Sequence, residues 1–284
     1  MKTPSTLIEA IRYLSDPDVC LEFVAALRWP DGKAICPGCG SEDVRFISTR
    51  RLWECKTKHP KRQFSVKVGT IFEDSPIGLD KWLAAIWMIA NAKNGVSSYE
   101  LHRAIGVTQK TAWFMLHRIR LAMQSDTFDR LNGTVEVDET FIGGAARFMH
   151  KSRRERKIKG TGGMGKTAVM GLLERHGPDG HSRVRAKIVR GTRRGDLVPE
   201  IRQAVDKDAE VITDNYRSYF HVRDEFKHHV IDHAEKYVDG QVHTNGIENF
   251  WSLLKRAIKG TYVAVEPFHL FRYIDEEVLR FNTR

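Results

Sequence analysis

The spacing of apolar residues changes twice along the first half of the chain. Residues 5–28 and 78–124 repeat them three and four positions apart, which predicts helices on both sides of the segment between. That segment, residues 31–74, carries short alternating runs broken by glycine, cysteine and proline, which predicts small antiparallel strands. Asp16 followed by Pro17 predicts the start of the second of two short N-terminal helices.

The second half of the chain predicts an alternation of strands and helices. Residues 125–133 are typical of a linker into this part. The predicted elements, in order, are the strand TVEVDETFI, a basic loop at residues 151–159, the strands TAVMGLLER and RVRAKIVR, the helix GDLVPEIRQAV, the strand EVITD, a helix, the short strand HHVID and two long helices. This order predicts an α/β fold with a mixed sheet flanked by helices.

The charge of the chain favours a polyanionic partner. Among 284 residues, 46 Lys and Arg stand against 36 Asp and Glu, which leaves a net charge of +10. Such an excess favours nucleic acid over a membrane. The N-terminus lacks the apolar centre of a signal peptide, and the longest apolar run, residues 82–90, is too short to span a bilayer. We therefore expect a cytoplasmic protein with reduced thiols.

The cysteines predict a zinc site. Cys36 and Cys39 are separated by two residues, and glycines beside them permit the tight turn that brings both sulfurs together. Cys55 follows sixteen residues later, and His59 is the next candidate, which gives a Cys3His zinc ribbon with structural Zn²⁺. An exposed loop histidine at position 59 is the alternative. Cys20 lies in an apolar helical pattern and is interpreted as a core residue.

Residues 97–123 predict a helix-turn-helix. Ser97 and Glu100 form a capping box, and Thr108 is placed to cap the second helix after the turn at Gly106. The helical spacing predicts an inward set of Ala112, Leu116, Ile119 and Met123. It leaves a more outward, DNA-facing set of Gln109, Lys110, His117 and Arg118. An ordinary helical hairpin with a solvated basic face is the alternative.

Three acidic residues are candidates for a catalytic metal site. Asp138 is a polar residue inside an apolar strand, Asp214 ends another strand, and Glu248 lies early in a helix. Cleavage of a phosphodiester by two metal ions needs acidic ligands brought together from separate elements, and α/β sheets place their sites at strand ends. Glu136 and Glu139, which flank Asp138, are alternative candidates for its role as a metal ligand. For any single acid, a strand-end cap or a surface salt bridge is the alternative.

The helix that carries Glu248 has two distinct faces. Its apolar stripe consists of Ile247, Phe250, Trp251, Leu254 and Ile258. Glu248, Ser252 and Lys255 share another face, being four and seven residues apart. We therefore expect Lys255 beside the Glu248 carboxylate, directed toward the phosphate of a substrate.

A glycine-rich stretch matches the pattern of a nucleotide-binding loop. It runs from Gly160 through four residues to Gly165, Lys166 and Thr167. A working loop follows a buried strand and opens a helix, whereas here a basic run precedes the glycines and a β-like run follows them. We interpret it as a flexible basic hairpin without a bound nucleotide, in which Lys166 contacts DNA phosphates or belongs to a solvated loop.

The stretches EVDETFIGG, ITDNYRSY and HTNGIENFWSLLKR, in this order, resemble the three acidic motifs of DDE transposases with a ribonuclease H-like fold. With CPGCG, QFSVKVGTIFEDSPIGLDKW and the helix-turn-helix, the chain resembles bacterial insertion-sequence transposases that carry an N-terminal zinc ribbon. The resemblance covers nearly all of residues 20–284. It implies that Asp138 and Asp214, 76 residues apart, are metal-binding aspartates, with the third position 34 residues further on.

The resemblance also implies chemistry and partners. Glu248 takes the third position, although some relatives use asparagine or histidine there, so Asn245 and Asn249 stay as alternatives. Lys255 matches the basic residue that such enzymes place near the DNA end. The implied protein holds Mg²⁺ (or Mn²⁺) on its acids, binds terminal inverted repeats, cleaves at the element ends and joins the freed 3′-OH to target DNA as a homo-oligomer. It would be associated with the bacterial nucleoid.

The predicted domains are an N-terminal helical segment (1–30), the zinc ribbon (31–75), the helix-turn-helix region (76–125) and the ribonuclease H-like catalytic domain (130–284). Two other functions remain alternatives. One is a DNA-binding regulator with an inactive catalytic domain, and the other is a ribonuclease H-fold nuclease that does not transpose.

Overall fold

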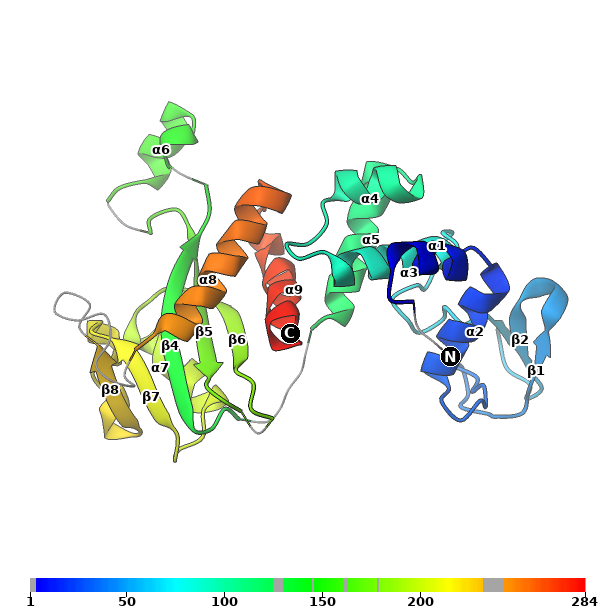
Figure 1. Cartoon of the computed structure of the whole chain (residues 1–284), viewed down its shortest axis with the longest axis horizontal. Helices are drawn as coiled ribbons and strands as arrows, with labels where there is room; N and C mark the ends of the chain where they lie inside the picture. Colours follow the sequence, from blue (N-terminus) through cyan, green and yellow to red (C-terminus); the bar gives the residue numbers. More distant parts are fainter. Residues whose placement is uncertain are drawn as a thin grey trace. The chain divides into compact units, whose positions relative to one another are not determined.

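The computed structural model divides the chain into two compact units, Met1–Ala122 and Met123–Arg284, which we call the N-terminal and C-terminal units (Figure 1). The structure describes residues 4–124, 130–144, 146–160, 163–177, 179–231 and 243–283. Most of the predicted linker therefore lies outside the described residues. Within the described part, no helix is long and apolar enough to cross a membrane.

The N-terminal unit begins with two short helices, α1 (Leu7–Leu14) and α2 (Pro17–Arg28). The predicted start of α2 is confirmed, because the Asp16 side chain accepts from the Asp18 backbone N–H at 2.8 Å and Pro17 occupies the first helical position. Cys20 is fully buried on α2, in agreement with its assignment to the core.

A small antiparallel sheet follows, with strands β1 (Val44–Ile47), β2 (Leu52–Cys55) and β3 (Gln63–Phe64) in that order. The alternating stretch QFSVKVGTIF, residues 63–72, also predicts a strand, but the third strand covers only its first two residues. Beyond Phe64 the chain forms turns, in which the Lys67 carbonyl accepts from both the Thr70 backbone N–H and the Thr70 hydroxyl. These local hydrogen bonds compete with strand pairing.

Three further helices complete the unit: α3 (Leu79–Asn91), α4 (Ser98–Ile105) and α5 (Gln109–Ala122). The capping box of Ser97 and Glu100 is present, and Gly106 ends α4 at a φ of +63°, a left-handed conformation that favours glycine. Thr108 caps α5 by accepting from the Thr111 backbone N–H at 3.1 Å. The predicted helix-turn-helix geometry therefore rests on the residues expected from the sequence.

The C-terminal unit contains a mixed sheet in the order β6-β5-β4-β7-β8. Its strands are β4 (Thr134–Ile142), β5 (Thr167–Glu174), β6 (Arg183–Val189), β7 (Glu210–Asp214) and β8 (Lys227–Ile231). β4 pairs antiparallel with β5 and parallel with β7, and β7 pairs parallel with β8. This arrangement confirms the expected ribonuclease H-like mixed sheet.

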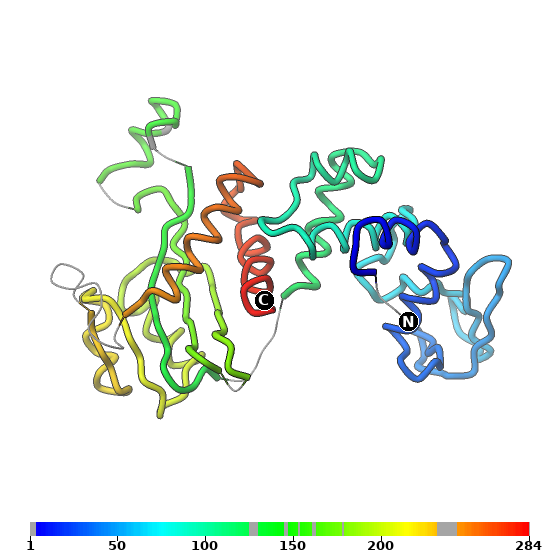
Figure 2. The backbone as a smooth tube through the Cα atoms, viewed as in Figure 1, coloured from blue at the N-terminus to red at the C-terminus, as the bar shows by residue number. Residues whose placement is uncertain are grey.

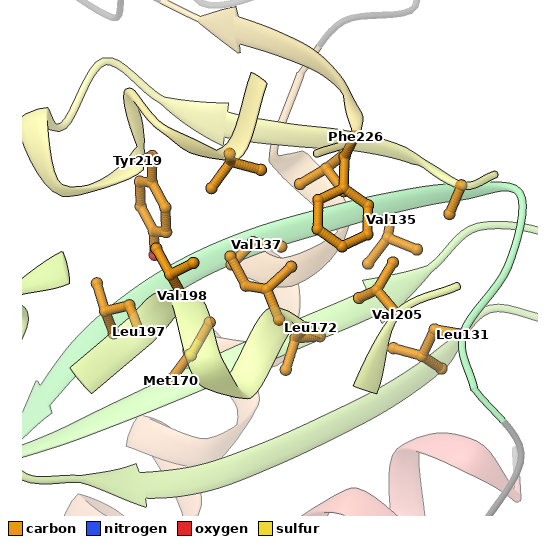
Figure 3. Packing of buried hydrophobic residues seen from close by; sticks show 14 of the residues in the cluster. Leu131, Val135, Val137, Met170, Leu172, Leu197, Val198, Val205, Tyr219 and Phe226 are labelled. Carbon is orange, nitrogen blue, oxygen red and sulfur yellow. The ribbon is translucent and has the colours of Figure 1, made fainter. Parts of the chain in front are cut away.

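Helices cover both faces of this sheet (Figures 1 and 2). On one face, Val135 and Val137 of β4 pack with Leu197 and Ile201 of α7 (Arg194–Ala204) in the cluster drawn in part in Figure 3. On the other face, a second apolar cluster joins strands β4–β6 to α8 (Asn245–Ala257) and α9 (Leu270–Asn282). Side chains alternate between the faces of a strand, so each strand contributes to both layers.

Two predictions about this unit were wrong. The helix expected after Asp214 is a pair of 3₁₀ turns, η3 (Arg217–Tyr219) and η4 (Val222–Asp224), which pack on the α7 face through Tyr219 and Val222. The basic loop at residues 151–159 instead forms a helix, α6 (Lys151–Lys157). Lysine, arginine and glutamate are good helix formers, so a run rich in charged residues is compatible with a short helix.

Candidate active site and metal centre

The predicted catalytic residues line one pocket of about 450 Å³ in the C-terminal unit. Asp138 comes from β4, Asp214 from the end of β7, and Glu248 and Lys255 from α8. The other lining residues are Glu139, Thr140, Thr244, Trp251 and Ser252. Three elements that are far apart in the sequence therefore bring four polar side chains to a common space.

The parallel pairing of β4 and β7 explains why the two aspartates meet. The register places Val137 beside Thr213, and Asp138 and Asp214 follow immediately on the two strands. Carboxyl ends of neighbouring parallel strands lie at the same edge of a sheet, which is where such folds place their sites. The position of Asp214 therefore follows from the strand register.

Asp138 is held in place by Trp251 of α8. The indole Nε1 donates to Asp138 Oδ2 at 2.9 Å, so a member of the apolar stripe of α8 also touches the site. Opposite Asp138 on β5 stands Gly171, and a Cβ at this position would lie 2.6 Å from two atoms of the Trp251 ring. Gly171 therefore leaves the space that the indole needs, and a glycine inside a strand is a signal for such a close approach.

Glu248 is oriented by Thr244, whose hydroxyl donates to Glu248 Oε1 at 2.9 Å. Both residues line the pocket. The alternatives Asn245 and Asn249 are exposed on α8 and do not belong to the lining. This placement supports Glu248 as the third acidic residue.

Glu136 and Glu139, the alternative candidates to Asp138, have different surroundings. Glu136 is almost fully buried and pairs with Arg175 at 2.6 Å, outside the set of pocket residues. Glu139 does line the pocket, and it lies next to buried Tyr219. Burial raises the pKa of Glu139 to about 8, and the neighbouring Asp138 and Asp214 charges add to the increase.

The donor chemistry of the pocket suits a hard divalent cation, but the ligand atoms of its three acids are not all gathered within 4.8 Å of one another. The pKa of Asp138 is raised to about 6, mainly by burial and also by the neighbouring charges of Asp214 and Glu248. A cluster of carboxylates is an all-oxygen donor set, the type that Mg²⁺ and Mn²⁺ prefer, and a bound cation would offset the repulsion between its members. Asp138, Asp214 and Glu248 are therefore the residues that would hold it.

A cluster of metal-binding side chains lies in the N-terminal unit. Ligand atoms of Cys36, Cys39, Cys55 and His59 all lie within 4.8 Å of one another, the only such set found among the described residues. Cys39 Sγ is 3.6 Å from Cys55 Sγ, and Cys36 Sγ is 3.3 Å from His59 Nε2. A tetrahedral zinc ion with Zn–S bonds of about 2.3 Å places its sulfurs roughly 3.8 Å apart, so the cluster supports structural Zn²⁺.

The cluster also favours the thiolate form that binds zinc. Burial opposes ionisation of Cys55, but hydrogen bonds with His59 and Cys39 outweigh it and lower the pKa of Cys55 to about 6. The interpretation of His59 as an exposed loop histidine does not fit, because its Nε2 faces Cys36 and its Nδ1 lies 2.7 Å from the Pro60 carbonyl.

The predicted DNA-facing set of α5 is not uniformly outward. Lys110 is exposed, whereas Gln109 donates to Ser98 Oγ at 2.8 Å and His117 packs in a tilted arrangement against Trp113, with 4.0 Å between ring centroids. Arg118 differs most from the prediction, because its Nη1 donates to two backbone carbonyls of the preceding segment. These are the carbonyls of Ile71 (3.1 Å) and Glu73 (2.6 Å). The segment forms turns instead of a strand, which leaves its carbonyls available to Arg118.

The glycine-rich stretch has the opposite context from a nucleotide-binding loop. Helix α6 precedes it and strand β5 begins at Thr167, although residues 161 and 162 lie outside the described part. The described residues between the two strands, 143–144, 146–160 and 163–166, form an arm between β4 and β5, and α6 stands beyond the ends of these strands (Figure 1). Lys166 is exposed at the base of this arm.

Comparison with known proteins gives a consistent result. Residues 130–282 match the ISXO2-like transposase domain, and residues 15–57 match the transposase zinc-ribbon domain. A protein of Halobacterium salinarum, described as an uncharacterized protein in transposable element ISH50, is 29% identical over 244 residues, which are 82% of this chain and 80% of that protein. An uncharacterized transposase-like protein of Haemophilus influenzae is 35% identical over 97 residues, 34% of this chain and 77% of the relative.

Both family matches lie where the structure has the corresponding features. The zinc-ribbon match contains the three cysteines of the metal cluster, and the transposase match contains the pocket with Asp138, Asp214 and Glu248. The transposase domain covers more than half of the chain. The chain therefore belongs to the family of ISXO2-like transposases.

Proposed function

We propose that the protein binds the terminal inverted repeats of an insertion sequence, cleaves DNA at the element ends and joins the freed 3′-hydroxyl to target DNA. The observation that carries this proposal is the common pocket of Asp138, Asp214, Glu248 and Lys255. Acids from separate elements beside a lysine form a donor set for divalent cations next to a binding group for phosphate.

Each residue of the pocket has a distinct role in this proposal. Asp138, Asp214 and Glu248 hold Mg²⁺, and Trp251 and Thr244 keep two of these carboxylates oriented through hydrogen bonds of 2.9 Å. Bound Mg²⁺ supplies Lewis-acid stabilisation of the charge that develops on the phosphate oxygens. Lys255 attracts the DNA phosphate and keeps it beside the carboxylates.

The N-terminal unit is the proposed reader of the inverted repeats. The zinc ribbon and the helix-turn-helix lie in one compact unit, and Lys110 of α5 is exposed for a DNA contact. Gln109 and His117 contribute if they leave their intramolecular partners, whereas Arg118 acts by holding α5 to residues 71–73. Phosphate contacts provide most of the affinity and base edges the specificity.

The arm between β4 and β5 is the proposed second DNA contact. Its described side chains include exposed Lys151, Arg154, Arg156 and Lys166, and no ion pair joins these four to an acid among the described residues. Such a group of cations attracts the DNA backbone without regard to sequence. We also propose that the protein works as a homo-oligomer, because joining requires two element ends to be brought together.

The test uses a labelled duplex that carries the inverted repeat found beside the gene, a plasmid target and Mg²⁺. The expected products are a nick at the element end and a covalent joint between the freed 3′ end and the plasmid. The Asp214→Asn variant should bind the duplex with unchanged affinity and give neither product. Cleavage without joining would favour the nuclease alternative, and binding without either product would favour the regulator.

A further inference from the structure

The N-terminus of α8 is capped in an unusual way. An N-cap residue normally accepts from the backbone N–H two or three positions into the helix through its own side chain. Thr244 occupies the N-cap position of α8, but its side chain makes no capping bond and donates instead to Glu248 at 2.9 Å. A residue from another element takes over the capping.

That residue is Glu136 of β4. Its Oε2 accepts from the Ile247 backbone N–H at 2.8 Å, and Ile247 is the third residue of the helix. The side chain of Glu136 is only 1% exposed. A carboxylate at a helix N-terminus is favourable because it interacts with the positive end of the helix dipole, and burial strengthens this effect.

Arg175 and His243 hold the Glu136 carboxylate from the other side. Arg175 Nε donates to Glu136 Oε1 at 2.6 Å, and its Nη2 donates to the His243 carbonyl at 2.6 Å. His243 Nδ1 lies 2.7 Å from Arg175 Nη2 and 3.6 Å from Glu136 Oε1. Glu136, Arg175 and His243, which we call the anchor cluster, therefore join β4, the end of β5 and the start of α8.

Gly246 shows how closely α8 approaches this cluster. A Cβ on Gly246 would lie 3.0 Å from both carboxylate oxygens of Glu136. The helix start therefore fits against Glu136 only with a very small side chain at this position. Because the approach is this tight, a change in the Glu136 side chain would displace the first turn of α8.

We propose that the anchor cluster positions the catalytic acids for metal binding. Glu136 stands two residues before Asp138 on β4, and Ile247 stands one residue before Glu248 on α8. The Glu136–Ile247 hydrogen bond therefore fixes the spacing between the two elements beside the pocket. It also releases Thr244 from capping, so that its hydroxyl orients Glu248. Glu136 and Arg175 are positioning residues, and this role rests on the proposed function of the pocket.

The chain offers a matched control for this proposal. Glu276 of α9 is 2% exposed and pairs with Arg280 at 2.6 Å, whereas Glu136 is 1% exposed and pairs with Arg175 at 2.6 Å. The two arginines are exposed to 12% and 11%. Glu136→Gln and Glu276→Gln therefore remove equivalent buried charges, but only the first removes one from the start of α8.

The test measures binding of Tb³⁺ alone to the zinc-loaded, full-length protein through luminescence sensitised by tryptophan, since Trp251 contacts Asp138. Glu136→Gln should weaken Tb³⁺ binding by about 10- to 100-fold, the usual effect of losing a partner that orients a metal ligand. It should also lower kcat for cleavage and leave KM for DNA unchanged. Glu276→Gln should lose similar thermal stability and keep both the Tb³⁺ affinity and kcat.

Equal Tb³⁺ affinities of the two variants would overturn the proposal. If Glu136→Gln does not fold, Arg175→Lys replaces it, because lysine keeps the charge but cannot contact Glu136 and the His243 carbonyl with separate nitrogens. Unchanged Tb³⁺ affinity in that variant would also overturn it. A wild-type protein that binds Tb³⁺ at the pocket without cutting DNA would refute the proposed function alone, since the anchor cluster is judged on metal affinity.

Discussion

The zinc cluster and the acidic pocket bring their side chains together in opposite ways. The four zinc ligands lie within 24 residues of sequence, and their ligand atoms lie within 4.8 Å of one another. The acids of the pocket span 111 residues and come from two strands and a helix. The first site is closed by its own ligands, as a structural site requires, whereas the second is an open pocket that Lys255 also lines.

The difference shows what each site depends on. The zinc ligands need only two short turns, so the site forms wherever these turns and a zinc ion are present. The acidic pocket depends on the register of β4 with β7 and on the fit of α8 against the sheet. Changes that disturb packing should therefore damage the acidic pocket more than the zinc cluster. Removal of zinc should damage the zinc cluster more than the acidic pocket.

The largest expected effect comes from removing one acid of the pocket. Asp138→Asn keeps the shape of the side chain and its contact with Trp251, but removes the charge. DNA cleavage in Mg²⁺ should fall by at least about 10³-fold, roughly 4 kcal/mol of activation free energy, since metal ions supply several kcal/mol of charge stabilisation. Gel assays of strand cleavage check this outcome.

Thermal unfolding provides a control for the same variant. Added Mg²⁺ should raise the Tm of the wild-type C-terminal unit, because a ligand that binds only the folded state stabilises it. It should have little effect on Asp138→Asn. An equal Mg²⁺-dependent increase in both proteins would mean that Asp138 does not hold the ion.

Loss of zinc should have the next largest effect, and this effect should be confined to the N-terminal unit. Cys39→Ser removes one of four ligands, so the ribbon is expected to unfold and specific DNA binding to weaken by at least about 100-fold, since zinc binding supplies most of the folding free energy of such small domains. Calorimetry should retain the transition of the C-terminal unit. Cys20→Ala, at a buried cysteine outside the cluster, should still bind one equivalent of zinc; loss of zinc from it would contradict the assigned ligand set.

A packing change should affect the acidic pocket and spare the zinc cluster. Gly171→Ala brings a methyl group to within 2.6 Å of the Trp251 ring and should lower the free energy of unfolding of the C-terminal unit by about 1–3 kcal/mol through overpacking. Denaturant unfolding measures the change. Gly195→Ala is the control, because nothing lies within 4 Å of the added methyl, and equal losses in the two variants would rule out the steric explanation.

The smallest expected effect concerns the arm. Lys166→Ala should weaken DNA binding a few-fold and reduce the slope of log affinity against log salt by roughly 1, the contribution of one phosphate contact. Fluorescence anisotropy at several salt concentrations checks this. The matched control is Lys207→Ala. Lys207 is exposed and precedes β7, whereas Asp214 ends this strand. Identical salt slopes for the two variants would show that Lys166 makes no phosphate contact.

The sequence predicted what depends on short stretches of chain. The bounds of β4, the capping box at Ser97 and the metal ligands around Cys36 each follow from a local pattern, and the structure has them as predicted. The three acids were found because polar residues interrupt apolar strands or begin a helix. Resemblance to a family then gave these residues a shared role.

Features that depend on contacts between distant segments were not predictable. Glu136 was a rival metal ligand until the structure paired it with Arg175 and the start of α8. Arg118 was expected to face outward, but its partners are carbonyls 45 and 47 residues earlier in the chain. No periodicity within α5 or β4 contains this information, because it depends on how separate segments pack.

The contact between Gly171 and Trp251 has a consequence for how the family diverges. The indole of Trp251 occupies the space that the side chain of any residue other than glycine would need at position 171. Neither residue is therefore free to change alone. We expect the two positions to covary among homologues, with larger residues at position 171 only where position 251 has lost its bicyclic ring. Lineages with such a double exchange would have to hold the first aspartate by another donor.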